Sequence, residues 1–292
     1  MMAEFVYGGQ AVIEGVMMRG PQDWAVAVRR PDQSIAVERR ANGSHEKRYP
    51  WLSWPLVRGV TALVEALVVG LQALTYSASQ AAAGEEVDLS RRDIILTLVA
   101  ALTLAAGLFI LLPALVADLV ARAAGGLERN LVEGLIRLLF LIGYVLVIGR
   151  VGDIKRVFQY HGAEHKVINA LEAGEDLTVD TVQKHSCHHP RCGTSFLLWV
   201  VVLAVLVFSL LGRQSIGAAL ASRLLLTPLV AALSYEWLRL TGRHQRHAVW
   251  RGLSAPGRWL QGLTTRPPDD RQVEVAISAL QAVFKKGETV VR

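Results

Sequence analysis

The sequence predicts a mainly α-helical integral membrane protein with about four transmembrane helices, an interfacial or re-entrant helix and a small N-terminal β unit. Apolar side chains make up 52% of the 292 residues and charged ones only 19%, whereas soluble proteins carry about 25% charged residues. The mean hydropathy is +0.34. The apolar residues concentrate in long runs between residues 56 and 240, which excludes a disordered or fibrous chain and indicates membrane helices.

The N-terminal segment, residues 1–50, is predicted to be the β unit. Trp24, Val26 and Val28 alternate along the chain, and Ile35 and Val37 alternate after a Pro-Asp turn. Alternation of this kind on both sides of a turn is typical of a β-hairpin. The start of the chain has no charged segment followed by an apolar one, so we expect no cleaved signal peptide.

Residues 51–82 follow as a helix that is not uniformly apolar. Arg58, Glu65, Gln72 and Ser79 recur every seven positions, and they therefore share one helix face. A helix with such a polar stripe either lies at the membrane interface or packs against other helices.

Four later stretches are each near the roughly 20 residues that cross a hydrocarbon core. These predicted spans are residues 94–119, 131–149, 195–212 and 217–239. They define a membrane domain at 94–240, which includes a polar segment at 150–194. The second span carries Glu133 and Arg137, four residues apart, and this spacing lets them pair. Few other polar residues lie in the spans, so a transporter is less favoured than an enzyme or a scaffold.

The remaining residues, 241–292, form a predicted cytoplasmic tail that contains an amphipathic helix. The sequence PPDD is a typical helix cap, and Val273, Ile277, Leu280 and Phe284 then share one face. With a first crossing at 94–119, the N-terminal segment, the 150–194 segment and this Arg-rich tail, which includes Arg246, lie on one side. Positively charged segments favour the cytoplasm. We therefore expect a multi-pass protein of the plasma membrane with both termini cytoplasmic.

The net charge of +6 has the same explanation. Basic residues lie beside apolar runs and do not follow one helix face, so no nucleic-acid partner is expected. The expected partners are the lipid bilayer and an unidentified cytosolic substrate or partner protein.

Histidines gather in one part of the chain, with five of the eight between residues 161 and 189. The stretch from Asp153 is predicted to be one helix that ends at Gly174, so His161 and His165 project from the same face one turn apart. Glu164 completes the order H-x-x-E-H of the inverzincin metallopeptidases, in which two histidines hold zinc and the glutamate activates water. The alternative is a helix with surface histidines.

A second cluster precedes the third predicted span and contains Cys187, His188, His189, Arg191 and Cys192. Thiolate and imidazole are the ligands that zinc prefers, although C-x₄-C is near, and not at, the usual finger spacing. The alternative is a juxtamembrane loop whose His and Arg side chains contact lipid phosphates. Inverzincins take a third ligand from a downstream acidic residue, and Glu236, late in the last span, is the candidate here.

Several segments of this sequence resemble the YqhQ-like family of bacterial membrane proteins. They are residues 8–20, 161–166 and 189–196, Ser234-Tyr235-Glu236, and the tail around Pro268, Asp270, Gln272 and Glu274. Such kinship implies a predicted metal-dependent enzyme without an established reaction. It also implies shared polar positions at Gln10, Glu14, Arg19, His161, Glu164, His165, His189, Arg191 and Cys192. Cys187 and His188 lie outside the family motif, which weighs against a C-x₄-C zinc clamp.

Two functional hypotheses follow. In the first, the protein is a membrane-bound zinc-dependent hydrolase, peptidase-like in its motif, at the cytoplasmic face. Glu164 is its general base, and Gln10, Glu14, Arg19 and Arg191 contact the substrate. The candidate ligands of the divalent metal, with zinc expected, are His161, His165, His189, Cys192 and Glu236. In the second, the protein is a non-enzymatic membrane scaffold, in which a structural zinc is closed by four protein ligands.

Overall fold

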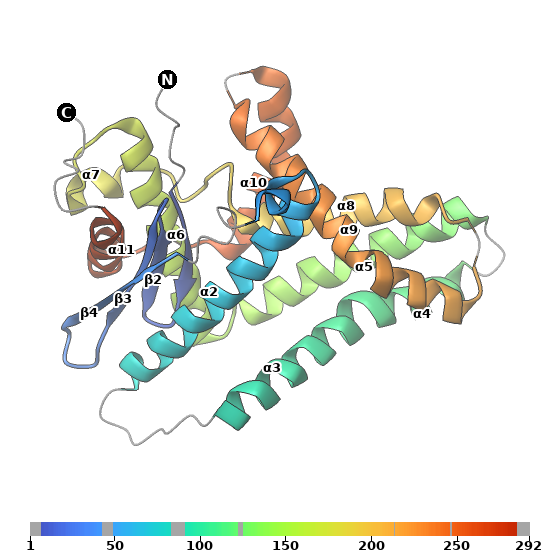
Figure 1. Cartoon of the computed structure of the whole chain (residues 1–292), viewed down its shortest axis with the longest axis horizontal. Helices are drawn as coiled ribbons and strands as arrows, with labels where there is room; N and C mark the ends of the chain where they lie inside the picture. The colour runs from blue at the N-terminus through green and yellow to red at the C-terminus, as the bar shows by residue number, and fades with distance from the viewer. Residues whose placement is uncertain are drawn as a thin grey trace.

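A small β-sheet and a long helical bundle lie at opposite ends of the molecule (Figure 1). The computed structural model describes residues 7–42, 49–82, 91–121, 125–212, 214–245 and 247–284. Arg246 of the predicted basic tail and the outermost residues of the predicted N- and C-terminal units lie outside the described residues. The fold class predicted from the sequence is confirmed.

The sheet has four antiparallel strands in the order β1-β2-β3-β4. Its strands are β1 (Gly8–Val12), β2 (Gly15–Arg19), β3 (Asp23–Arg29) and β4 (Ile35–Ala41). The predicted hairpin is the β3–β4 pair, in which Val28 lies opposite Ala36. Glu14 lies in the two-residue β1–β2 turn with a φ of 51°, in the left-handed region that residues other than glycine adopt uncommonly.

Helices pack against both faces of the sheet. Trp24, Val26 and Val28 pack against α2 (Val57–Ala81). The intervening Ala25 and Ala27 belong to a second core, shared with two helices on the opposite face. Because alanine adds little bulk, helices approach this face closely, and the sheet becomes the middle of three layers.

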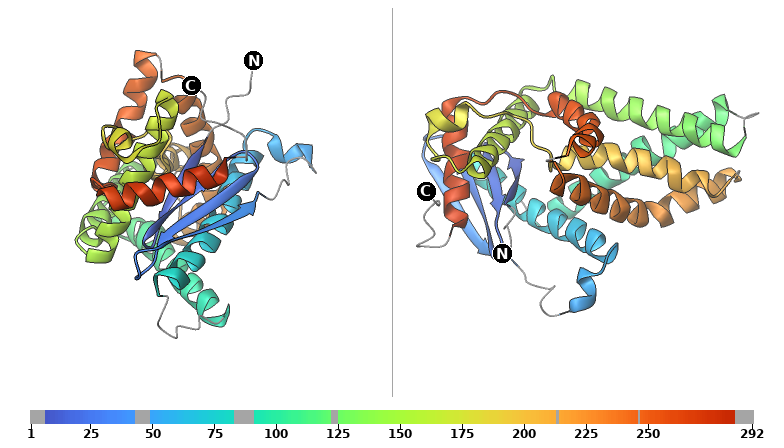
Figure 2. Two further views of the ribbon diagram at one scale, coloured as in Figure 1. Left: turned by 90° about the vertical axis from the view of Figure 1, so that its left-hand side faces the viewer. Right: turned by 90° about the horizontal axis from the view of Figure 1, so that it is seen from above.

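The helices of that opposite face are α6 (Gly152–Ala173) and α11 (Asp270–Val283). The short α7 (Val179–Gln183) packs against both of them. Asp269 caps α11 through the Gln272 N–H, and the predicted apolar face of α11 is buried. Figure 2 shows α11 lying across the sheet. The first and last described parts of the chain therefore share one hydrophobic core.

The bundle contains α3 (Arg91–Ala106), a π-helical segment (Gly107–Leu111), α4 (Leu112–Val120), α5 (Gly126–Ile148), α8 (Gly193–Ser209) and α9 (Ile216–Arg243). Among the described residues, four helices are long and apolar enough to cross a membrane: Val57–Ala81, Ile95–Val120, Gly126–Ile148 and Gly217–Arg243. Three coincide with predicted spans. The predicted span at 195–212 corresponds to the shorter α8, whereas α2 meets the length and composition criteria.

Helix α2 packs on both the sheet and the bundle helix α9. The 3₁₀ turn η1 (Pro50–Ser53) precedes it. Near its start, Arg58 pairs with Glu236 of α9, and farther along Ala73 packs on the sheet. The remaining helix, α10 (Ala248–Thr264), packs on α8 beside the sheet end of the bundle.

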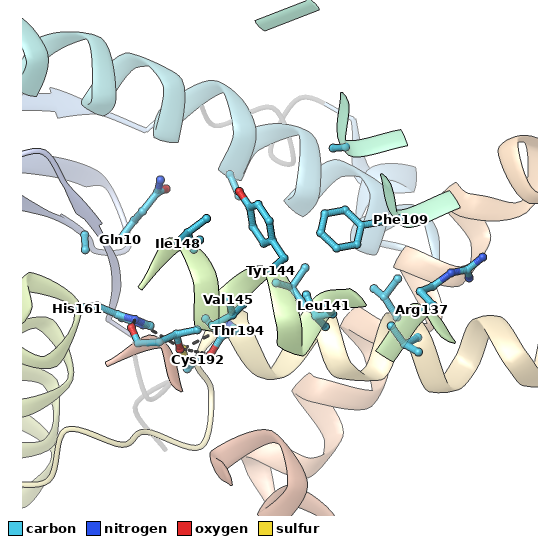
Figure 3. Close-up of a pocket in the computed structure, with 18 of the residues that line it drawn as sticks. Gln10, Phe109, Arg137, Leu141, Tyr144, Val145, Ile148, His161, Cys192 and Thr194 are labelled. Atoms are coloured by element: carbon cyan, nitrogen blue, oxygen red, sulfur yellow. Dashed lines mark hydrogen bonds between the residues drawn. The ribbon is translucent and has the colours of Figure 1, made fainter. Parts of the chain in front are cut away.

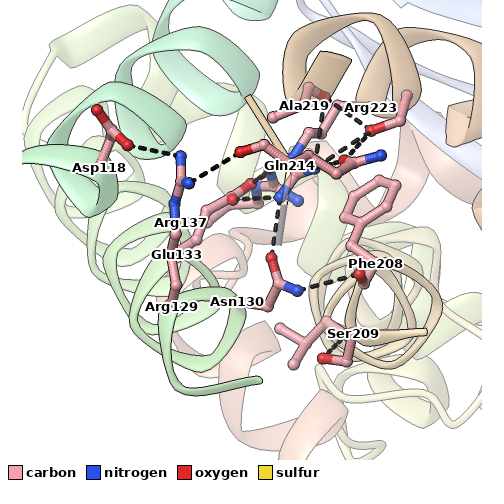
Figure 4. A network of polar contacts seen from close by, with 12 residues as sticks. Asp118, Arg129, Asn130, Glu133, Arg137, Phe208, Ser209, Gln214, Ala219 and Arg223 are labelled. Carbon is pink, nitrogen blue, oxygen red and sulfur yellow. Dashed lines mark hydrogen bonds and ion pairs between the residues drawn. The ribbon is translucent and has the colours of Figure 1, made fainter. Parts of the chain in front are cut away.

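A buried polar network crosses the bundle (Figure 4). Glu133 accepts hydrogen bonds from Arg137 at 2.8 Å and from Arg223 at 2.7 Å. Arg223 also donates to Asn130 at 3.0 Å, and Arg129 pairs with Asp118 at 2.9 Å. The predicted Glu133–Arg137 pair is confirmed. The network is larger than the sequence suggested, because Arg223 of α9 joins it from a distant part of the chain.

Candidate metal centre

Three predicted ligands converge where α6 meets the start of α8. One ligand atom from each of His161, His165 and Cys192 lies within 4.8 Å of the other two. His161 Nε2 is 3.2 Å from Cys192 Sγ, and the two imidazole centroids are 4.4 Å apart. The helical spacing of the histidines could be predicted from the sequence, whereas the position of Cys192 beside them depends on the fold.

Backbone carbonyls fix the orientation of both imidazoles. His161 Nδ1 lies 2.9 Å from the Thr264 carbonyl oxygen, and His165 Nδ1 lies 2.6 Å from that of Cys187. A carbonyl oxygen only accepts, so each Nδ1 carries the hydrogen and each Nε2 keeps a lone pair. Histidines that ligate metals are oriented by such contacts.

Cys192 is the N-cap of α8. The Thr194 backbone N–H donates to its sulfur at 3.4 Å, and the Thr194 hydroxyl lies 3.2 Å away. The partial positive charge of a helix N-terminus favours an anionic group at this position. Cys187 has a different role, since it supplies its backbone carbonyl to His165 and burial raises the pKa of its thiol. Both thiols are free.

The donor set fits a zinc ion. Catalytic zinc sites use three protein ligands and leave one position open, and sets that mix thiolate and imidazole are among them. Two imidazoles with free Nε2 lone pairs and one buried cysteine meet this requirement. The carbonyl contacts behind the rings supply the outer support that such ligands need.

Glu164 lies beside these ligands and is 7% exposed. Its side chain lines the same cavity as His161 and Cys192, and the Gly9 backbone amide is among the groups that lower the pKa of its carboxyl. Burial raises the pKa of Glu164, against the opposing influence of His161. Strand β1 passes this close because residue 9 is glycine: a Cβ there would lie 3.0 Å from Glu164 Cγ.

His189 is buried near the centre but has another partner. Its ring centroid lies 6.0 Å from that of His165, and its Nε2 lies 3.3 Å from a Glu172 carboxylate oxygen. Burial lowers the pKa of His189 to about 4. Arg191 pairs with the same Glu172. The structure therefore places both predicted residues in the supporting loop and outside the three-residue group.

Glu236 is not brought to the centre, contrary to the sequence-based expectation. Its carboxylate forms two hydrogen bonds with the Arg58 guanidinium, at 2.6 and 2.5 Å. The position of an acidic residue along the chain does not reveal which helix its side chain faces. Here it faces α2, and the ion pair fastens α9 to that helix.

The predicted substrate-contacting residues of the β unit lie in different places in the structure. Gln10 lines the cavity with Glu164. Glu14 pairs with Arg156 of α6, and Arg19 pairs with Glu65 of α2 at 2.6 Å. These two ion pairs attach the sheet to the helices on its two faces, so only Gln10 is placed where a substrate contact is possible.

Sequence reasoning missed the residues that hold the 183–192 loop. Gln261 of α10 accepts from the His189 N–H at 2.9 Å and donates to the His189 carbonyl at 2.8 Å and to Ser195 Oγ at 2.9 Å. Lys166 donates to the carbonyls of Gln183 and His185 at 2.5 and 2.7 Å. The position of Lys166 next to His165 could have indicated its role from the sequence, whereas a single glutamine in an amphipathic helix gives no such indication.

Gly162 allows another chain segment to reach the histidines. A Cβ on Gly162 would lie 2.1 Å from the Arg266 carbonyl oxygen, and the Arg266 N–H donates to the Phe158 carbonyl at 2.9 Å. The segment after α10 therefore crosses α6 beside Gly162. This crossing is what places the Thr264 carbonyl on His161.

Two comparisons with known proteins find relatives of this chain. The family model described as "Protein of unknown function (DUF1385)" matches residues 54–286. The "Uncharacterized protein YqhQ" of Bacillus subtilis (strain 168) is 35% identical over 294 residues, which cover 96% of this chain and 92% of that protein. No solved structure matches the chain. The resemblance drawn from the motifs is confirmed, and the chain belongs to the DUF1385 family of YqhQ-like membrane proteins.

Proposed function

We propose that this protein is a membrane-bound, zinc-dependent hydrolase whose metal is held by His161, His165 and Cys192. The observation that supports the proposal is the convergence of three ligand atoms within 4.8 Å, with both imidazoles oriented by carbonyls. Zinc held by these residues would supply Lewis acidity that polarises the scissile group and activates water.

Glu164 is the general base in this proposal. Its side chain lines the cavity with two of the ligands, and strand β1 passes close beside it at Gly9. It takes one proton from the attacking water and delivers it to the leaving group. The water oxygen bonds to the electrophilic atom of the substrate as the bond to the leaving group breaks, so the reaction is a hydrolysis and needs no further reactant.

The site is assigned to the cytoplasmic side. It lies at the end of the bundle that carries the sheet (Figure 1), and the basic segments of the chain adjoin this end. Positively charged segments favour the cytoplasm. A hydrolase here would act at the inner face of the plasma membrane.

The alternative is a scaffold with a structural zinc, and the nearness of His189 is the observation that favours it. A closed structural site requires four protein ligands. His189 Nε2 is instead directed at Glu172. A three-ligand site with one open position thus agrees better with the geometry.

Metal analysis of matched cysteine variants tests the proposal. We expect about one zinc per wild-type chain, retention of zinc in Cys187→Ser, and its loss in Cys192→Ser and His165→Ala, since only the latter two remove ligands. Equal zinc content in Cys187→Ser and Cys192→Ser would reject the assigned ligands. Glu164→Gln should keep the metal, because Glu164 is not a ligand.

Cobalt substitution then distinguishes the enzyme from the scaffold. Co²⁺ in an open three-ligand site should change its visible spectrum when azide is added, because azide occupies the free position. A spectrum indifferent to azide would indicate four protein ligands and favour the scaffold.

A further inference from the structure

A cavity of about 800 Å³ extends from the metal centre into the membrane bundle. Figure 3 shows His161, Cys192 and Thr194 at one end and Arg137 at the other. Such a volume is within the roughly 300–1,000 Å³ typical of ligand sites. The cavity is too large to be a packing defect, and its long direction follows the bundle.

The middle of the cavity is apolar. Its walls include Phe109 of the π-helical segment Gly107–Leu111, Leu141, Tyr144 and Val145 of α5, and Val201 of α8. Arg137 at the far end already donates to Glu133 at 2.8 Å. Polar chemistry is therefore concentrated at the metal end, where Glu164 and Gln10 also line the wall.

These walls select against a hydrophilic substrate. An extended peptide in the apolar section would leave its backbone N–H and C=O groups without partners, which costs several kcal/mol for each group. A hydrocarbon chain has no such groups and gains from burial. The cavity also reaches Ala105, which is exposed on α3, so a chain can enter from the side that faces lipid.

We propose that the substrate is a membrane amphiphile: its acyl chain occupies the bundle cavity and its hydrolysable linkage lies at the His161–His165–Cys192 centre. That the amphiphile is hydrolysed rests on the proposed hydrolase function. The occupancy of the cavity by an acyl chain does not depend on it.

Photolabelling tests the occupant. The full chain is reconstituted into phosphatidylglycerol vesicles that contain a phospholipid with a diazirine on its acyl chain, and the labelled residues are mapped by mass spectrometry after illumination. We expect labels on Leu141 and Val145, which are only 7% and 6% exposed, in addition to labels on outward-facing residues. Absence of label on these two residues would overturn the proposal.

A matched pair of variants on α8 controls for lipid around the protein. Ala204 is 2% exposed and lines the cavity, whereas Leu206 is 58% exposed and faces outward. Ala204→Phe should reduce the interior label at least fivefold, and Leu206→Phe should leave it unchanged. Equal effects of the two variants would contradict an internal chain.

Competition by hydroxamates tests whether chain and linkage share one site. Decanohydroxamate carries a metal-binding head, and decanamide is a control with the same chain and a weakly binding head. In the zinc-loaded wild type, the hydroxamate should displace the photolabel at least tenfold more effectively than the amide. Shortening the hydroxamate by one methylene should weaken it about fourfold, equivalent to about 0.8 kcal/mol. Equal potency of the two compounds in the wild type would refute a continuous site.

His165→Ala separates the two proposals. Interior labelling that persists in this variant, with the advantage of the hydroxamate lost, supports an acyl pocket joined to a metal centre. Zinc in the wild type without interior labelling rejects the amphiphile and leaves the hydrolase intact. Interior labelling in a wild type without zinc rejects the hydrolase and retains the acyl pocket.

Discussion

The sheet end and the bundle differ in the side chains that they bury and in those that they expose. The core enclosed by the sheet, α6 and α11 is made mainly of Val, Ile, Leu and Ala side chains, and the bundle has apolar clusters as well. The bundle encloses Glu133, Arg137 and Arg223 and exposes Leu135 and Leu139, each 58% accessible. One end is organised as for water and the other as for lipid, because charged groups in a bilayer must face inward and pair.

The difference shows why the candidate centre lies where the two ends meet. Its ligands come from α6 of the sheet end and from the N-cap of α8 in the bundle. In the function proposed above, a polar centre there receives water from one side and the hydrocarbon chain of its substrate from the other. Neither end alone provides both environments.

The largest expected effect comes from the bundle network. Glu133→Gln leaves Arg137 and Arg223 buried without their carboxylate, and removing one partner of a buried ion pair typically costs about 3–5 kcal/mol. Thermal unfolding in detergent should therefore shift strongly. Glu38→Gln is the control, since its pair with Arg40 is exposed by 30% and 44% and such pairs contribute about 0–1 kcal/mol. Similar losses in both variants would mean that the network is not held out of water.

A pair of identical substitutions compares the two ends directly. Leu280→Ala in α11 removes a side chain that is 0% exposed and should lower the free energy of unfolding by about 2–5 kcal/mol. Leu139→Ala on the outer face of α5 should change it by less than about 0.5 kcal/mol in lipid, because that position has lipid around it in place of a protein core. A large loss at Leu139 would indicate that another protein surface covers this face.

The smallest expected effect concerns the junction. Gln261 is 0% exposed and holds the loop that carries His189. Gln261→Ala should weaken zinc binding about 10–100-fold, as loss of outer support does in other metal sites, with the ligands still present. Competition with a chelator measures the change. Gln281→Ala, at an exposed position on α11, should have no effect; an unaltered zinc affinity in Gln261→Ala would show that the loop needs no such support.

Local patterns in the sequence predicted much of the fold. Alternation predicted the β3–β4 hairpin, hydropathy predicted the bundle, and the capped apolar face predicted α11. The position of α2 was not predictable in the same way. Its apolar length suits a membrane span, yet it packs on both the sheet and α9, and contacts between distant segments leave no periodic signal.

The candidate ligand pair followed from local sequence alone, because an α-helix with about 3.6 residues per turn places His161 and His165 on one face regardless of what surrounds them. The rest of the centre depended on the three-dimensional packing of the chain. That packing brings Cys192, at the start of α8, to His161 of α6, and it pairs Glu236 with Arg58. Helical spacing is a local property of the backbone, whereas the meeting of separate helices depends on the packing of the whole chain.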